Sequence, residues 1–363
     1  MRQIGVFPHE ITARQFSAVL ASQQIEHSID ASFDPNEEKA SYAIWVHDED
    51  RLAEAAAILG RFHANPNSVE FVIAQPEPLS VNKAALEQEE ERRRHRTPKL
   101  TIFWIFLCVL LFFMNAMQEA ALKKAGFSQE QFLFTPIRFQ LMYDIPPALE
   151  TLEPSIQEGI ANPDAIEAAL ENTPYWRGVF PWTIVKIMGG QEDLQGDTAF
   201  YKLKQGQIWR LFTPSLLHGG LLHIAFNMLW LWVLGKEIDP RIGLFRSILL
   251  TLSIGIVSNT VQYLMSGPFF LGYSGIVMGL AGFIWSRQRQ APWEGYPLKR
   301  SVLLFLALYV LAMVFLQIGS VFILITTQKV FFPNIANAAH LCGGLWGIWM
   351  GRLSFFGARG IRS

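Results

Sequence analysis

The sequence predicts an all-α polytopic membrane bundle of six transmembrane helices, preceded by a small α+β cytosolic domain. Two observations support this prediction. Of the 363 residues, 51% are hydrophobic and the mean hydropathy is positive, which is too apolar for an ordinary soluble protein. The long apolar runs all begin at or after residue 100, and several of them are long enough to cross a bilayer. The formal net charge is -1, so the composition gives no indication of a nucleic-acid partner.

Residues 1–75 predict the small α+β domain. Strands are expected at 3–7, 27–33 and 41–47, and helices at 11–24 and 50–63. The alternation of Tyr42, Ile44 and Val46 is typical of a half-buried strand, and the two helices would back the sheet. Because no residues here have catalytic spacing, we expect a regulatory or interaction role for this domain.

Residues 76–99 are expected to form a linker and a basic juxtamembrane segment. The basic run at 92–96 predicts a cytoplasmic N-terminus by the positive-inside rule, although simple contact with phospholipid headgroups would use the same residues. The first apolar stretch begins near Leu100, which is too late for a cleavable signal peptide. We therefore expect it to act as an uncleaved anchor.

Residues 100–355 are expected to hold the six spans, at about 100–118, 214–235, 244–265, 272–287, 300–325 and 335–354. Basic residues gather beside alternate turns, which predicts that both termini and the 356–363 tail are cytoplasmic. The long external loop at 119–211 mixes acidic, proline-containing and aromatic pieces, so we expect it to be partly helical and partly interfacial. Cys108 and Cys342 both fall within spans, which indicates neither a disulfide nor a metal ligand. We expect no cofactor and no metal.

Ser274 is the candidate nucleophile. The sequence GYSG at 272–275 opens the fourth span, so this serine lies in the first turn of a helix. Backbone N–H groups there have no intrahelical partners and can stabilise an oxyanion. A helix-capping serine is the alternative for so short a pattern. The GxSxG elbow of soluble hydrolases is excluded because position 276 is isoleucine.

Three further polar residues fall in or beside spans, where ionisable groups are costly. His223 and Asn227 are four residues apart in HIAFN, so they share one helix face and can donate to one point. For a lone histidine, an interhelical hydrogen bond is the alternative. His340 lies in the last span. His223, His340 and Ser274 are expected in the outer half of the membrane.

Glycine stripes predict that the fourth and sixth spans pack closely. The face of the last span that carries His340 also carries Gly343, Gly347 and Gly351, and a similar stripe of Gly275, Gly279 and Gly282 follows Ser274. Small residues let two membrane helices approach each other. We therefore expect His340 to come within reach of the Ser274 hydroxyl.

Together, four motifs resemble those of the rhomboid intramembrane serine proteases: GxSG, AHxxGxxxG, HxxxN, and the pair Trp209-Arg210 that precedes HxxxN. The resemblance covers about residues 100–355, with six spans in the family's order. The N-terminal unit also resembles the small cytosolic domain of some bacterial members. The resemblance implies an integral protein of the bacterial inner (cytoplasmic) membrane that acts, within the lipid bilayer, on single-span or multi-span membrane protein substrates. It predicts neither the natural substrate nor the oligomeric state.

The resemblance also implies roles for individual residues. Ser274 would be the nucleophile and His340 the general base and later acid, in a dyad that forms an acyl-enzyme. His223, Asn227 and backbone N–H groups near Ser274 would form the oxyanion hole. The other residues implied for oxyanion or substrate binding are Gly272, Tyr273, Gln262 and Met278. Gln262 matches a position that lines the family's water cavity, and Met278 stands where the family often has a tyrosine under the histidine.

These observations predict a serine endopeptidase that cleaves transmembrane segments near the outer leaflet. A rhomboid-like pseudoprotease that binds membrane proteins without cleavage is the alternative, against which the intact Ser274 and His340 argue. No Asp or Glu falls within the expected spans, which disfavours an aspartyl protease, and HIAFN is not the HExxH of zinc enzymes. A transporter would be expected to show internal repeats, and none is seen.

Overall fold

The computed structural model describes residues 1–34, 39–66, 68, 71, 97–124, 135–158, 162–190, 198–327 and 336–358. The chain divides into two units: residues 1–96, 288–295 and 359–363 form the first, and residues 97–287 and 296–358 form the second. The basic run at 92–96 and most of the expected linker lie outside the described residues. Each unit is described by itself below.

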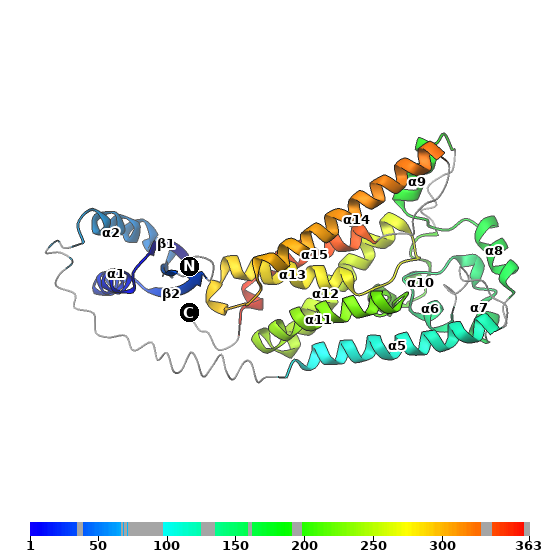
Figure 1. The fold of residues 1–363 in the computed structure, drawn as a ribbon, viewed down its shortest axis with the longest axis horizontal. Helices are drawn as coiled ribbons and strands as arrows, with labels where there is room; N and C mark the ends of the chain where they lie inside the picture. The colour runs from blue at the N-terminus through cyan, green and yellow to red at the C-terminus, as the bar shows by residue number, and fades with distance from the viewer. Residues whose placement is uncertain are drawn as a thin grey trace. The chain divides into compact units, whose positions relative to one another are not determined.

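The first unit contains a three-stranded antiparallel sheet and two helices (Figure 1). The strands β1 (Arg2–Phe7), β2 (His27–Asp34) and β3 (Lys39–Val46) lie in the order β1-β3-β2. The helices are α1 (Glu10–Ser22) and α2 (Leu52–Ala64). Ile44 and Val46 are fully buried and pack with aromatic rings of Phe7, Phe16 and Phe62. The strands and helices therefore form within a few residues of the predicted positions, because alternation along β3 directs one set of side chains into the core.

The second unit contains a helix in each of the six expected spans. These helices are α5 (Lys99–Lys124), α11 (Leu221–Ile242), α12 (Leu244–Ser266), α13 (Ser274–Gln290), α14 (Arg300–Thr327) and α15 (Asn337–Gly351). Among the described residues, α5, α11, α12 and α14 are long and apolar enough to cross a membrane. The other two are shorter, with 17 residues in α13 and 15 in α15.

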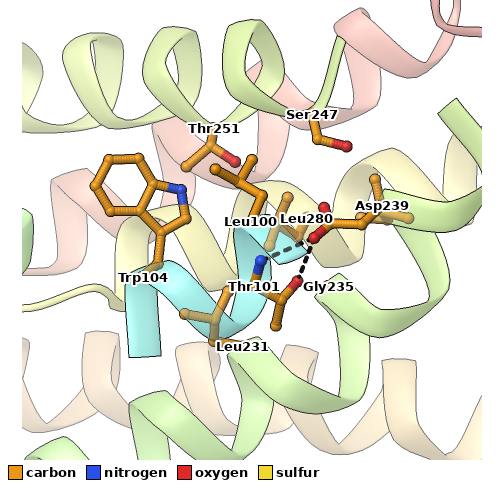
Figure 2. Close-up of a pocket in the computed structure, with 10 residues that line it drawn as sticks. Leu100, Thr101, Trp104, Leu231, Gly235, Asp239, Ser247, Thr251 and Leu280 are labelled. Atoms are coloured by element: carbon orange, nitrogen blue, oxygen red, sulfur yellow. Dashed lines mark hydrogen bonds between the residues drawn. The ribbon is translucent and has the colours of Figure 1, made fainter. Parts of the chain in front are cut away.

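Helix α11 continues beyond the predicted end of its span at residue 235, so its last turns include Glu237 and Asp239. The expectation that no acidic residue falls within a span stays a prediction. The Asp239 carboxylate accepts hydrogen bonds from the backbone N and the Oγ1 of Thr101, both at 2.8 Å (Figure 2). Thr101 lies in the first turn of α5, whose N–H groups need such partners. Asp239 thus fixes the start of α5 against the end of α11, beside a small cavity.

The described part of the external loop contains five short α-helices, at the end of the bundle where α5 ends and α11 begins (Figure 1). They are α6 (Pro136–Leu141), α7 (Glu153–Glu158), α8 (Pro163–Asn172), α9 (Val179–Ile187) and α10 (Tyr201–Lys204). Apolar side chains of α6, α7 and α8 pack on Leu217, before α11, and on Phe269 and Leu271, before α13. The loop is therefore a folded layer on the connections that lead to His223 and Ser274.

Buried cations of this layer have partners, which removes most of the cost of burying charge. Arg210 donates from one nitrogen to the backbone carbonyls of Phe139 at 2.9 Å and Met142 at 2.7 Å. Lys202 Nζ lies 3.3 Å from the carboxylate of Glu150 and 3.4 Å from that of Glu153, the first residue of α7. The Tyr201 hydroxyl also donates to Glu150, and this hydrogen bond lowers the pKa of that carboxyl.

Candidate active site

Helices α13 and α15 touch through backbone, because glycine occupies the contact positions of both. A Cβ at Gly343 would lie 2.2 Å from the carbonyl oxygen of Gly275, and a Cβ at Gly347 would lie 1.8 Å from that of Gly279. Real Cβ atoms essentially never approach other heavy atoms within 3.0 Å. Any side chain at these positions would therefore separate the two helices.

This contact brings the first turns of the two helices together. Ser274 is the first residue of α13, and His340 is in the first turn of α15. His340 Nε2 lies 2.8 Å from Ser274 Oγ, within hydrogen-bond distance. The histidine is 5% exposed, and its Nδ1 has no hydrogen-bond partner among the residues that the structure describes. The pair has the geometry of a nucleophile and its base without a third, acidic member.

His223 and Asn227 of α11 lie beside the backbone that leads into Ser274. A Cβ at Gly272 would be 2.7 Å from His223 Nε2 and 3.8 Å from Asn227 Nδ2. Gly272 also has a φ of +122°, a conformation that L side chains rarely adopt. Glycine is therefore required there, and the two potential donors face the approach to the serine.

His218 is a histidine for which the sequence predicted no role. Its ring packs edge-on against that of His223, with centroids 5.2 Å apart, and it is 2% exposed. His218 Nδ1 lies 3.3 Å from the carbonyl oxygen of Leu216, which fixes one side of the ring. His218 thus supports the position of His223 rather than reaching the serine itself.

Gln262 of α12 contacts the helix that carries His340. Its Oε1 accepts a hydrogen bond of 3.0 Å from the backbone N of Ala339, in the first turn of α15. That N–H has no acceptor within its own helix, so the glutamine satisfies a donor that would otherwise be buried and unpaired. Gln262 is 1% exposed. Its expected place beside a water cavity stays a prediction.

Tyr273 and Met278 both direct their side chains into the apolar core of the bundle. Tyr273 is fully buried, so only its backbone is free to contribute to oxyanion binding. Met278 is partly buried against the same core. The ring of Tyr309 on α14 lies beside that of His340, with centroids 6.2 Å apart, in the range of aromatic contacts. No motif singles out Tyr309 among the aromatic residues of its helix.

The comparison with known families agrees with this geometry. Residues 205–356 match the family model of the Rhomboid domain. This match identifies residues 205–356 as a Rhomboid domain. The matched part of the chain runs from just before Trp209 to beyond the end of α15, so it includes Ser274, His340, His223 and Asn227. The family predicted from the motifs is thereby confirmed. It makes this rhomboid protein an integral membrane protein, and either an intramembrane protease or a pseudoprotease.

Proposed function

We propose that this rhomboid protein is an intramembrane serine endopeptidase that uses Ser274 and His340 as a catalytic dyad. The observation that carries the proposal is the 2.8 Å separation of His340 Nε2 from Ser274 Oγ. A general base must lie within about 2.6–3.2 Å of the proton that it abstracts. A pseudoprotease would not require the pair to keep this geometry.

In the proposed reaction, Ser274 Oγ attacks the carbonyl carbon of the scissile peptide bond while His340 Nε2 takes the hydroxyl proton. The tetrahedral intermediate then collapses, the C–N bond breaks, and His340 gives the proton to the leaving amine. Water attacks the resulting acyl-enzyme with His340 again as base, which releases the carboxylic acid product and restores the serine. Since no carboxylate orients Nδ1 among the described residues, neutral contacts such as the Tyr309 ring position the histidine.

The oxyanion would be stabilised by donors that converge on the start of α13. The N–H groups of its first turn have no intrahelical acceptors, and His223 and Asn227 lie beside Gly272. Asn227 Nδ2 donates at 3.0 Å to the carbonyl oxygen of His223, which holds the amide in place and leaves its second N–H for substrate. Loss of one such donor typically costs about 3 kcal/mol of transition-state stabilisation.

The proposal extends to the topology. Six spans, with α13 and α15 as the two short ones, would leave both termini in the cytoplasm and the external loop at the end of the bundle that carries Ser274. Cleavage would then occur near the outer leaflet of a bacterial inner membrane, in transmembrane segments of other membrane proteins. Residues 1–75 would form an accessory cytosolic domain that the reaction does not need.

Labelling with a fluorophosphonate probe tests the nucleophile on the detergent-solubilised full chain. We expect the wild type to be labelled, Ser274→Ala to be unlabelled and His340→Ala to be labelled far more slowly. Ser253→Ala is a matched control, because the one hydrogen bond of this serine among the described residues goes to the Leu250 carbonyl within α12. Cleavage of a single-span substrate should follow the same order. A folded wild type that captures the substrate by crosslinking without labelling or cleavage would identify a pseudoprotease instead.

A further inference from the structure

Tyr263 of α12 connects the external loop to the bundle. It follows Gln262 in the sequence and is 1% exposed. Its hydroxyl donates to Asp144 Oδ2 at 2.7 Å and accepts from the backbone N of Phe200 at 2.8 Å. Its ring stacks on that of Tyr143, with centroids 4.6 Å apart. One phenol thus holds two segments of the external loop that are more than 50 residues apart.

Asp144 makes this connection more than a single hydrogen bond. The residue is 3% exposed, and its carboxylate also accepts from the backbone N atoms of Tyr201 and Lys202, both at 2.8 Å. A buried carboxylate is tolerated only when such donors satisfy it. Removal of the Tyr263 hydroxyl would leave the carboxylate one donor short and free the loop from α12 at this point.

A third segment of the loop is seated on the last turn of α12. The indole N–H of Trp176 donates to the carbonyl oxygen of Tyr263 at 3.0 Å. Two residues later, a Cβ at Gly178 would lie 2.5 Å from the backbone N of Ser266. The backbones of the loop and of α12 are therefore in direct contact at this point. The end of α12 is therefore enclosed by the loop.

The position of Gln262 shows what this enclosure can control. Successive residues of a helix project about 100° apart, so Tyr263 faces the loop while Gln262 faces α15. Gln262 Oε1 holds the backbone N of Ala339, the residue before His340. A rotation or shift of the end of α12 would move this acceptor, and with it the first turn of α15.

We propose that Tyr263 is a positioning residue for His340. The external loop is bound to α12 by the hydrogen bond between the Tyr263 hydroxyl and Asp144, which we call the latch. The latch fixes the end of α12, so Gln262 holds the first turn of α15 in the orientation in which His340 reaches Ser274. This inference rests on the proposed protease function. It assigns to the external loop a role in turnover that is independent of any direct contact with substrate.

Tyr263→Phe tests the latch with the loss of one oxygen atom. We expect kcat for a single-span substrate to fall ~10-fold with KM unchanged within about twofold, because small displacements of reacting groups cost turnover rather than binding. Labelling of Ser274 by fluorophosphonate should slow by a similar factor. Tyr143→Phe is the matched control: it removes a phenol hydroxyl from the same aromatic cluster, but one that bonds Thr260 at 2.8 Å and not Asp144. Its kcat should stay within about twofold of the wild type.

A double-mutant cycle separates positioning from general stability. Gln262→Met removes the acceptor for Ala339 at similar volume. If Tyr263 acts through Gln262, then Tyr263→Phe should lower kcat little further in the Gln262→Met background. Asp144→Asn weakens the same hydrogen bond from its other partner, and this variant replaces Tyr263→Phe in the test if Tyr263→Phe does not fold.

Equal losses of kcat in Tyr263→Phe and Tyr143→Phe would overturn the inference. So would additive effects with Gln262→Met, or a lower thermal midpoint with unchanged kcat. These outcomes differ from failure of the proposed function, in which the folded wild type itself would neither cleave substrate nor react with the probe at Ser274.

Discussion

Under the proposed protease function, Gly347→Ala should strongly lower turnover by separating the two helices that carry Ser274 and His340. The new Cβ would lie 1.8 Å from the carbonyl oxygen of Gly279, and Cβ contacts below 3.0 Å essentially never occur. The difference, 3.0 − 1.8 = 1.2 Å, is the least by which the backbones must move apart at this point. The Nε2–Oγ distance is now 2.8 Å, so a similar displacement at His340 would take it to about 4 Å, beyond hydrogen-bond range. We expect turnover to fall on the order of 100-fold.

The same substitution should lower stability, since overpacking typically costs about 1–3 kcal/mol. Gly344→Ala is the matched control on the same helix, because the nearest atom to its Cβ would be the Met278 carbonyl oxygen at 3.8 Å, an ordinary contact. Helix propensity alone would make this control slightly more stable, by about 0.5–1 kcal/mol. Turnover, probe labelling and thermal unfolding would be measured on both purified variants. Wild-type turnover in Gly347→Ala would refute the idea that direct backbone contact sets the dyad distance.

Three further predictions follow from the site and the cytosolic unit. Tyr309→Leu should lower turnover several-fold while Tyr309→Phe retains it, if an aromatic ring supports His340; equal turnover in the two variants would exclude that support. A chain that begins near Glu90 should still cleave a model substrate in detergent, and a folded but inactive truncation would make the N-terminal unit necessary. Burial lowers the pKa of His27 below its ordinary value, so between pH 7.5 and 6 the unfolded state takes up more protons than the folded one and the cytosolic unit should lose stability. Hydrogen exchange of that unit in the full chain would measure this loss; His27→Gln should reduce it, and a gain in stability on acidification would contradict it.

The pairing of Ser274 with His340 could be predicted because its causes are local in the sequence. GYSG sets the serine at a helix start, and the glycine stripes of α13 and α15 specify which faces meet. Each is a pattern within about 15 residues, and the close contact between the helices follows from side-chain size alone. The positions of His223 and Asn227 on one face of α11 follow in the same way from their spacing.

The external loop could not be predicted because its fold depends on contacts between distant residues. Arg210 binds the carbonyl oxygens of Phe139 and Met142, which lie 71 and 68 residues away, and Tyr263 binds Asp144 over 119 residues. Backbone carbonyls as partners leave no trace in the sequence. The aromatic residues at 175–182 indicated an interface but not which element they cover.

The end of α11 was also misplaced, for a different reason. The apolar run stops at Gly235, and hydropathy therefore ended the span there. The helix continues to Ile242 because the Asp239 carboxylate has Thr101 as a partner, and it stops where Gly243 adopts a φ of 82°. Backbone geometry and a long-range hydrogen bond, rather than hydropathy, determine this boundary.

The lengths of the helices bear on the thickness of the bilayer around the protein. At 1.5 Å per residue, the 17 residues of α13 and the 15 of α15 extend about 25 Å and about 22 Å, against a hydrocarbon core of roughly 30 Å. The 28 residues of α14 extend about 42 Å. In the proposed six-span topology, α13 and α15 would require the lipids beside them to thin, whereas α14 would tilt. This hydrophobic mismatch would couple the helices that carry Ser274 and His340 to the acyl-chain length of the surrounding lipid, so the membrane itself would help to determine their position.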